Sequence, residues 1–282
     1  MNWKKLTIDS RDELQEFLKN RFETSDMNFT NLFLWSFSEN IQYSIYDDVL
    51  YIKGFYEGNE YYFSPVSKFD DKENIVKAVE KIKENGGKIV FIPESYEKFL
   101  KDVYPIKEER DSFDYIYLQE DLAELKGRKF SSKKNKINKF KKTYNFTYEK
   151  ISKENIEEIR IFQREWTENR KEDSIIISET MGIEELLNNY ENLGLRGGII
   201  KVDKKIVAYA IGEKLTADMG VIHIEKGIFD YQGSYQMINM YVAKEEFSDV
   251  QYINREDDFG SLGLREAKLS YQPIKLIKKY SI

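Results

Sequence analysis

The amino-acid sequence predicts a mixed α+β protein of two domains that follow one order of helices and strands. Hydrophobic residues change repeatedly between the helical period and the strand period of two, which indicates alternating types of element. The chain of 282 residues is long for one domain, and its 15% aromatic residues and 4 prolines favour an ordered core. Each half is therefore expected to form a mostly antiparallel mixed sheet flanked by helices.

The first half begins with a strand and two helices, and its hydrophobic period then changes to two. Turn residues at 47–48 and 57–59 separate three alternating runs, which predicts an antiparallel meander. Asp70 or Asp71 then caps a helix, and the glycine pair at 86–87 ends it. The expected elements of this half are strands at 4–8, 41–46, 49–55, 60–65, 88–92 and 112–118 and helices at 10–20, 28–37, 70–85 and 94–101.

The second half repeats this order, with two helices before a three-strand meander. Ile156, Ile159 and Phe162 lie on one face of the first helix. Turns at 203–204 and 217–218 separate the three strands. The expected elements are helices at 152–169, 178–190, 235–247 and 262–271 and strands at 195–202, 206–215, 221–229, 250–253 and 274–282.

This succession of two helices, a three-strand meander, and then helix, strand, helix and strand is the order of the GNAT-type acyltransferase fold. Because the succession occurs twice, we expect two tandem GNAT-like domains with a basic connecting helix at 126–150 between them. The N-terminal domain, at 1–125, is expected to be degenerate, since its turn at 66–71 has no glycine and two acids that would repel phosphate. The C-terminal domain, at 151–282, is expected to carry the site.

Composition excludes several classes of protein and of site. The net charge of −6 argues against a protein that is basic overall, as many nucleic-acid-binding proteins are. The absence of cysteine removes disulfides and thiolate ligands, and the single histidine argues against a His-rich metal site, so we expect no metal. The chain lacks an apolar signal region and any run of about 18 apolar residues. We therefore expect a cytoplasmic protein with no integral membrane segment.

One basic segment departs from this overall charge. Residues 126–142 contain nine basic side chains and no acid, and their apolar residues are spaced to lie on one helical face. The basic side chains should then face water and bind phosphate groups, for example of a tRNA. The candidate phosphate-binding residues are Arg128, Lys129, Lys133, Lys134, Lys136 and Lys139. The alternative is a solvated helix whose charges are relieved by the acids at 120–124.

The central strand of the C-terminal domain carries two candidate catalytic residues. Alternation along 221–228 places His223 and Glu225 on one side of the strand, where a carboxylate can tune an imidazole for acid or base catalysis. The alternative is a histidine that is only hydrogen-bonded within the fold. The turn after this strand offers Tyr231, Gly233 and Tyr235 as binding residues. It keeps one glycine where acetyl-CoA-binding turns carry two or more, which argues against ordinary coenzyme A binding.

Residues 254–268 gather ionisable and amide side chains where a strand ends and a helix begins. Such junctions collect ligands, because strand ends open a crevice and helix N-termini present free N–H groups. Glu256 or Asp258 could accept a proton, as Glu225 could, and the other candidates could hold a carboxylate or phosphate. These other candidates are Asn254, Arg255, Arg265 and Lys268. The alternative is an internal ion-pair network that seats the last helix.

Several motifs spread over most of the chain carry a further signal when they are taken together. They are NLFLW at 31–35, DYIY at 114–117, LKGRK at 125–129, KKNKINKF at 133–140, IHIEK at 222–226, YINREDD at 252–258, GLR at 263–265, AK at 267–268 and YQP at 271–273. Together they resemble the bacterial family grouped with the C-terminal domain of phosphatidylglycerol lysyltransferase. The resemblance implies a tandem GNAT fold related to lipid lysyltransferases and to Fem-type peptidyltransferases, which take an aminoacyl group from a charged tRNA.

These features lead us to expect a transferase that moves an acyl group, and by the resemblance an aminoacyl group, to an amine or hydroxyl acceptor. The donor would be an aminoacyl-tRNA or an acyl-CoA, and the acceptor a small molecule or a lipid headgroup. No bound cofactor is assigned. Two alternatives stay open: a non-catalytic module that binds RNA or another phosphate-bearing partner, and an acyl-CoA-dependent N-acetyltransferase.

Overall fold

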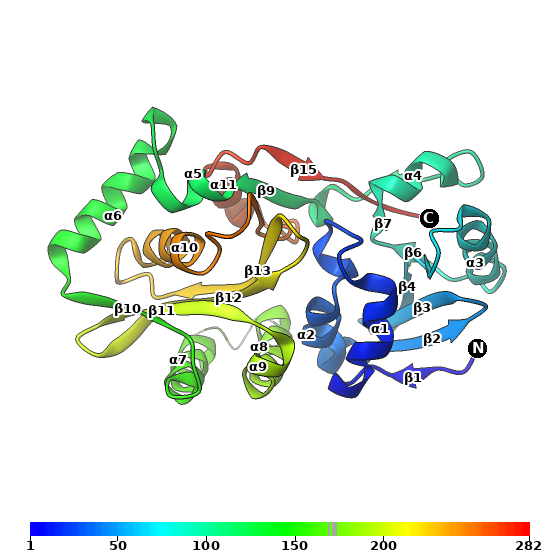
Figure 1. Ribbon diagram of the computed structural model, residues 1–282, viewed down its shortest axis with the longest axis horizontal. Helices are drawn as coiled ribbons and strands as arrows, with labels where there is room; N and C mark the ends of the chain where they lie inside the picture. Colours follow the sequence, from blue (N-terminus) through cyan, green and yellow to red (C-terminus); the bar gives the residue numbers. More distant parts are fainter. Residues whose placement is uncertain (169, 171–173) are drawn as a thin grey trace.

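The computed structural model describes residues 1–168, 170 and 174–282, which form two α+β halves side by side (Figure 1). The first half is built on a six-stranded sheet in the order β1-β2-β3-β4-β6, with β5 beside β3. Its strands are β1 (Lys4–Lys5), β2 (Gln42–Tyr46), β3 (Val49–Tyr56), β4 (Asn59–Phe63), β5 (Val66–Ser67) and β6 (Ile89–Val90). Its helices are α1 (Arg11–Leu18), α2 (Phe29–Glu39), α3 (Lys72–Glu84) and α4 (Glu94–Leu100). The antiparallel meander β2-β3-β4 is confirmed.

The second half is built on a seven-stranded sheet in the order β10-β11-β12-β13-β14-β9-β15. Its strands are β9 (Asp114–Leu118), β10 (Phe146–Lys150), β11 (Arg196–Val202), β12 (Lys205–Lys214), β13 (Met219–Gly227), β14 (Tyr252–Asn254) and β15 (Lys275–Ile277). Its helices are α5 (Gln119–Glu124), α6 (Ser131–Thr143), α7 (Ile156–Glu168), α8 (Ser174–Asn188), α9 (Tyr190–Leu193), α10 (Ser234–Glu245) and α11 (Leu262–Leu269). The meander β11-β12-β13 is confirmed, and the helix end expected at Asn169 lies outside the described residues.

Helices cover both faces of the second sheet. Alternate strand residues separate the two faces, since Ile200 packs in the cluster under α10, α6 and α5, whereas Ile199 packs in the cluster under α7 and α8. The α7–α8 cluster continues into the core of the first half through α2. Gly182 of α8 lies against α2, and a Cβ there would sit 2.0 Å from the carbonyl oxygen of Leu34. One continuous core therefore joins the halves.

Two segments cross between the halves in a way that the sequence did not predict. β9 lies between β14 and β15 in the second sheet, although it precedes the boundary expected at residue 125. The strand expected at 274–282 is two strands, because β15 pairs with β9 and β16 (Lys279–Ser281) returns to the first half. There β16 pairs with β7 (Ile92–Pro93) and β8 (Lys107–Glu108), so the C-terminus lies beside the first half in Figure 1. The domain limits stay predictions.

A buried lysine explains the break in the last strand. Lys279 is fully buried and forms ion pairs with Asp26 and with Asp114, the latter at 2.7 Å. Ser25 also donates its backbone N–H to Asp114, at 2.7 Å. A buried charge needs such partners, and here they come from the first half and from β9. The ion pairs therefore hold the end of the chain across both halves.

The helix expected over 126–150 is shorter than predicted. α6 ends at Thr143, and Phe146–Lys150 form β10, which pairs antiparallel with β11. The segment alternates in the manner of a strand, and Phe146 and Tyr148 pack against Tyr241 of α10, with ring centroids 6.0 and 5.2 Å apart.

Among the described helices, none is both long and apolar enough to cross a membrane.

Candidate functional site

The strands β13 and β14 separate at the centre of the second sheet. They pair in parallel only where Met219 to Val221 of β13 lie beside Tyr252 to Asn254 of β14. Glu225 lies further along β13, and Arg255 follows directly after β14. The two charged side chains meet across the opening between the strands, where the sequence analysis expected a crevice. The parallel pairing and its early end therefore position the pair.

The guanidinium of Arg255 contacts both carboxylate oxygens of Glu225. Nη2 donates to Oε1 at 2.9 Å and to Oε2 at 3.1 Å. The guanidinium carbon lies 4.7 Å from the ring centre of Tyr271 and 5.5 Å from that of Tyr117, so two aromatic rings surround the cation. The second nitrogen, Nη1, is buried and has no hydrogen-bond partner among the described residues. Arg255 thus keeps one donor available in a largely enclosed place.

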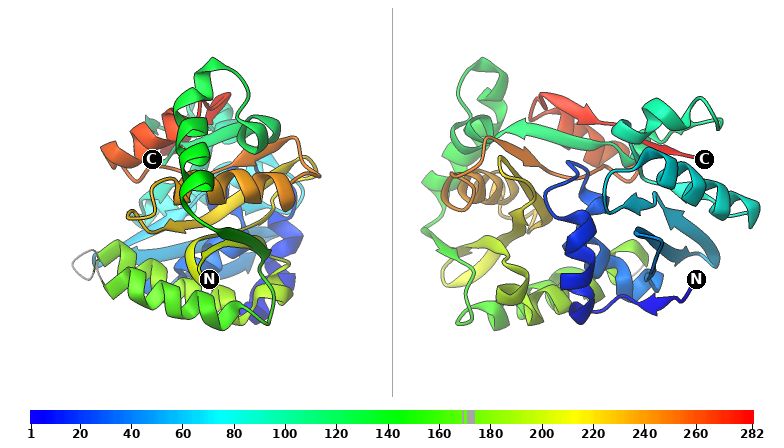
Figure 2. Two further views of the ribbon diagram at one scale, coloured as in Figure 1. Left: turned by 90° about the vertical axis from the view of Figure 1, so that its left-hand side faces the viewer. Right: turned by 45° about the vertical axis from the view of Figure 1, so that its right-hand side comes forward.

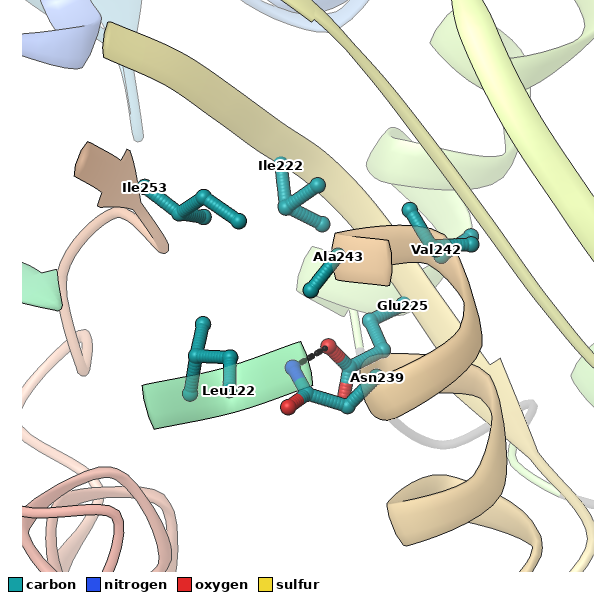
Figure 3. Close-up of a pocket in the computed structure, with 8 residues that line it drawn as sticks. Leu122, Ile222, Glu225, Asn239, Val242, Ala243 and Ile253 are labelled. Atoms are coloured by element: carbon teal, nitrogen blue, oxygen red, sulfur yellow. Dashed lines mark hydrogen bonds between the residues drawn. The ribbon is translucent and has the colours of Figure 1, made fainter. Parts of the chain in front are cut away.

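Asn239 of α10 completes this group. Its Nδ2 donates to Oε2 of Glu225 at 3.0 Å, as Figure 3 shows, and its Oδ1 is buried without a partner in the described chain. The carboxylate and amide close one end of a narrow crevice. Its other lining residues are aliphatic: Leu122, Ala210, Ile222, Val242, Ala243 and Ile253. The walls stand too close together for a water molecule, so a substrate could enter only if side chains move.

His223 and Glu225 lie on opposite faces of the sheet, and the prediction that they are neighbours is wrong. Ile224 pairs with Ile211, but Ile222 pairs with the next residue, Gly212, so His223 is an extra residue in the ladder. Such a β-bulge reverses the alternation on one side of it. Ile222 and Glu225 therefore face α10, whereas His223 faces the first half.

His223 is held between two carboxylates. Its Nδ1 lies 2.8 Å from Oε1 of Glu256, and its Nε2 lies 3.1 Å from Oε1 of Glu213. Burial lowers the pKa of the imidazole, but the hydrogen bonds and charges of the two carboxylates outweigh it and raise the pKa to about 9. The ring is then a cation with both nitrogens donating. Asn31 of α2 also donates to Glu256, at 3.1 Å, so this group connects the halves.

Asp258 forms a separate ion-pair cluster in which its own carboxylate is buried. Arg265 of α11 donates to its two oxygens at 2.9 and 2.7 Å, and Arg110 donates at 3.2 Å. The hydroxyl of Tyr115 donates at 2.5 Å. Burial raises the pKa of Asp258, but the hydrogen bonds from Arg265 and Tyr115 prevail and hold it at about 2. This arrangement is the ion-pair network that seats the last helix.

Lys268 and Asn254 hold the backbone of the segment that carries Arg255. Lys268 is buried, and its Nζ donates to the backbone carbonyls of Arg255 and Asp257. Asn254 is also buried and donates to the carbonyl of Glu23 at 2.9 Å. Neither side chain reaches an open surface. Of the residues predicted around 254–268, Arg255 alone meets Glu225, and Lys268 and Asn254 position the segment from behind.

The turn before α10 is covered by α6. Gly233 begins α10 with φ of 100°, and a Cβ there would lie 2.8 Å from the carbonyl oxygen of Lys136 and 3.2 Å from Cβ of Phe140. Figure 2 (left) looks onto α6, which crosses in front of α10. The two tyrosines of the turn pack rather than open a pocket, since Tyr231 lies 5.2 Å from the ring of Tyr144 and Tyr235 lies 5.5 Å from the ring of Phe229. The turn has no free approach for a pyrophosphate.

The basic residues of 126–142 other than Lys133 face water as predicted, and α6 buries Ile137 and Phe140 beneath them. Some charges have partners: Lys129 pairs with Asp121 at 2.8 Å, and Lys139 donates to Gln232 at 2.8 Å. Lys133 is half-buried, with Nζ 4.6 Å from the ring centre of Tyr271, so it borders the ring that also contacts Arg255. The side chains of the three other candidates make no ion pair or hydrogen bond within the described chain: Arg128, Lys134 and Lys136.

Sequence reasoning missed three residues of these groups. Asn239 stands among the buried residues Met237, Ile238 and Val242 of α10, and a polar residue in an apolar stripe is a recognisable signal. Glu213 gives a similar signal, since it ends a run of eight buried residues on β12. Tyr271 offers no such signal of a functional role, because an aromatic residue after a helix commonly packs in the hydrophobic core.

Solved structures share this fold. A conserved protein of unknown function from Bacteroides thetaiotaomicron is 34% identical, with a TM-score of 0.89 over 100% of this chain and 98% of that chain. The C-terminal domain of a putative lysylphosphatidylglycerol synthetase from Agrobacterium fabrum is 13% identical, with a TM-score of 0.68 over 96% of this chain and 91% of its own. FemX is 10% identical, with a TM-score of 0.58 over 100% of this chain and 97% of its own. These likenesses confirm the tandem GNAT-like fold.

A curated relative matches part of the chain. An uncharacterized protein of Mycoplasmoides gallisepticum is 25% identical over 173 residues, which are 61% of this chain and 56% of that protein. The match therefore spans little more than half the length of the relative. The family model described as phosphatidylglycerol lysyltransferase, C-terminal, matches residues 19–282. The fold and this match indicate an acyltransferase-like domain, and the chain belongs to the family of the phosphatidylglycerol lysyltransferase C-terminal domain.

Proposed function

We propose that the protein transfers an aminoacyl group from a charged tRNA to an amine or hydroxyl acceptor at the Arg255–Glu225 pair. The observation that carries the proposal is the buried, unpartnered Nη1 of Arg255 beside a carboxylate, where β13 and β14 separate. Acyl transfer needs a donor for the carbonyl oxygen and an acceptor for a proton, close together and shielded from water. Nη1 and Glu225 supply this combination.

The chemistry assigns one role to each side chain. The nitrogen or oxygen of the acceptor attacks the carbonyl carbon of the aminoacyl ester, and Glu225 takes its proton. Nη1 of Arg255 donates to the carbonyl oxygen as that oxygen gains charge. The bond to the ribose oxygen of the tRNA then breaks, and that oxygen leaves with the proton from Glu225. Because the crevice beside Glu225 is closed, the substrate must displace part of the Arg255–Glu225 contact when it binds.

The surroundings favour a tRNA donor over an acyl-CoA donor. The exposed basic face of α6 begins beside Tyr271, the ring that lies against Arg255, and a phosphate backbone could follow it. In contrast, α6 covers the turn at Gly233, where acyl-CoA enzymes receive the pyrophosphate. The acceptor could be a small molecule or a lipid headgroup, and the chemistry of the pair serves either.

Mass spectrometry of products tests the proposal. The protein is incubated with a mixture of isotope-labelled charged tRNAs, or with acyl-CoA donors, together with amine, hydroxyl and lipid acceptors. We expect labelled product from tRNA only, and its loss in Glu225→Gln. Glu246→Gln is the control, because Glu246 has a different partner: it accepts a hydrogen bond from the hydroxyl of Tyr148 at 2.8 Å. No product from any charged tRNA, or full activity in Glu225→Gln, contradicts the proposal.

The non-catalytic alternative predicts a different result. An RNA-binding module would bind tRNA with a strong salt dependence but would form no product from any donor. The coenzyme A alternative predicts stabilisation by coenzyme A, of about 2.7 kcal/mol when the ligand is at 100 times its Kd. A thermal-shift screen against coenzyme A and uncharged tRNA therefore separates the coenzyme A alternative from the two tRNA-binding functions, and product formation from charged tRNA separates those two from each other.

A further inference from the structure

The loop between β13 and α10 contacts the basic helix α6 and carries an exposed aromatic ring. Phe229 is 74% exposed, among the largest values for an apolar side chain in the described chain. Its neighbours on the loop rest on α6: Gln232 accepts from Lys139 at 2.8 Å, and Tyr231 packs on Tyr144 with ring centroids 5.2 Å apart. Phe229 itself contacts Tyr235, with ring centroids 5.5 Å apart. The loop that carries Phe229 therefore rests on α6, and most of the Phe229 ring is open.

We infer that Phe229 and the exposed lysines of α6 bind the unpaired 3′ end of an RNA. A cationic surface that follows the phosphates, together with an aromatic ring on which a base stacks, is the combination that binds single-stranded nucleic acid. Lys134 and Lys136 are exposed and have no ion pair within the described chain, so they are available to phosphates. The inference rests on the proposed function and names the surface through which the tRNA donor would be held.

The position of the ring agrees with this role. Phe229 follows Glu225 by four residues on the same strand and loop, so their Cα atoms are at most about 14 Å apart. A terminal nucleotide stacked on the ring would keep its ester close to the Arg255–Glu225 pair.

Asp230 is the only acid among residues 228–233, and it is exposed. It should weaken phosphate binding, because like charges repel.

The first experiment measures the Kd of uncharged tRNA and of a blunt-ended acceptor duplex without the unpaired 3′ end. Phe229→Ala should weaken binding of tRNA by about tenfold, which corresponds to one lost base stack, and leave binding of the blunt duplex unchanged. Phe69→Ala is the matched control, since Phe69 is 72% exposed but lies just before α3, in the first half. Asp230→Asn should strengthen binding of both RNAs. Unfolding curves show whether each variant is folded.

The outcomes separate this inference from the proposed function. Equal loss on tRNA and blunt duplex, or no loss in Phe229→Ala, overturns the stacking role of Phe229 even if aminoacyl transfer is observed. Selective loss of tRNA binding with no transfer from any charged tRNA supports the RNA surface and contradicts the transferase. An equal effect of Phe69→Ala shows that an exposed ring anywhere on the chain suffices, and it also overturns the inference.

Discussion

The guanidinium of Arg255 contacts both oxygens of Glu225 and shares the ring of Tyr271 with Lys133 of α6. Three elements therefore meet at one place: β13 supplies the carboxylate, the segment after β14 supplies the guanidinium, and α6 supplies the neighbouring positive charge. Lys268 fixes the segment from behind by binding the carbonyl of Arg255. The arrangement joins the Arg255–Glu225 pair to the basic face of α6.

Binding of tRNA should depend on salt through the lysines of α6. For single-stranded phosphates each contact contributes about −0.7 to the slope of log K against log salt. The double variant Lys134→Gln/Lys136→Gln should therefore make the slope shallower by about 1.4. The measurement is the tRNA Kd from 50 to 300 mM salt.

Lys72→Gln/Lys77→Gln on α3 is the matched control, because both lysines are exposed on a helix of the first half. It removes the same charge from the protein. If the slope of log K against log salt is shallower in both double variants, the salt dependence comes from the net charge of the protein and not from the lysines of α6.

The stability of the protein should fall as the pH rises through the pKa of His223. The folded pKa of about 9 lies above the ordinary value of 6.5, so the contribution is complete below pH 6.5 and is lost as the pH rises through 9. Its size is on the order of 3 kcal/mol. Denaturant unfolding at pH 6 to 10 measures it.

His223→Gln removes this titration and is the reference for the pH series. Burial also moves the pKa of Asp257 up and that of Lys268 down toward the same range, so only the difference between wild type and variant reports on His223. A constant difference across pH 6 to 10 would show that the imidazole is not charged in the folded protein.

Replacement of Asp258 should destabilise the fold, although Asp258 takes no direct part in the proposed transfer. Asp258→Asn leaves Arg265 and Arg110 without their buried carboxylate, which should cost about 3 kcal/mol. Asp111→Asn is the control, because Asp111 pairs with the same Arg265 but has a side chain that is 68% exposed. It should cost less than about 1 kcal/mol. Equal costs in urea unfolding would contradict the network described.

Replacement of Lys279 should uncouple the end of the chain from both halves. Lys279→Met keeps the volume but leaves Asp26 and Asp114 buried without a cation, at a cost of about 3 to 5 kcal/mol. Its neighbour Lys278 pairs with Glu108 on the surface, and Lys278→Met should be nearly neutral. Hydrogen exchange of β16 measures the local effect, and unchanged protection in Lys279→Met would contradict the role of this lysine.

The sequence indicated the local elements well and the connections between them poorly. The meanders and the apolar face of α6 follow from the spacing of neighbouring residues, which short-range pattern reveals. The crossing of β9 and the division of the last strand depend on Lys279 meeting Asp26 and Asp114, which are far apart in the sequence. No local pattern reports such a contact.

The candidate site shows the same limit. The sequence indicates both Glu225 and Arg255 as candidates, but their pairing depends on how two strands separate. Strict alternation places His223 beside Glu225, and one extra residue in the ladder moves it to the other face. A β-bulge changes the register of the strand, but the residue types of the strand do not reveal it.

Single-turnover transfer of a labelled aminoacyl group from charged tRNA by Arg255→Lys tests the central claim most directly. Lysine keeps the charge but loses the donor geometry of Nη1, so the transfer rate should fall by about 100-fold while tRNA affinity is retained. Arg196→Lys is the matched control, since Arg196, the first residue of β11, forms a similar pair with Asp249 at 2.6 Å and should keep the wild-type rate. A rate for Arg255→Lys equal to that of Arg196→Lys would contradict the account.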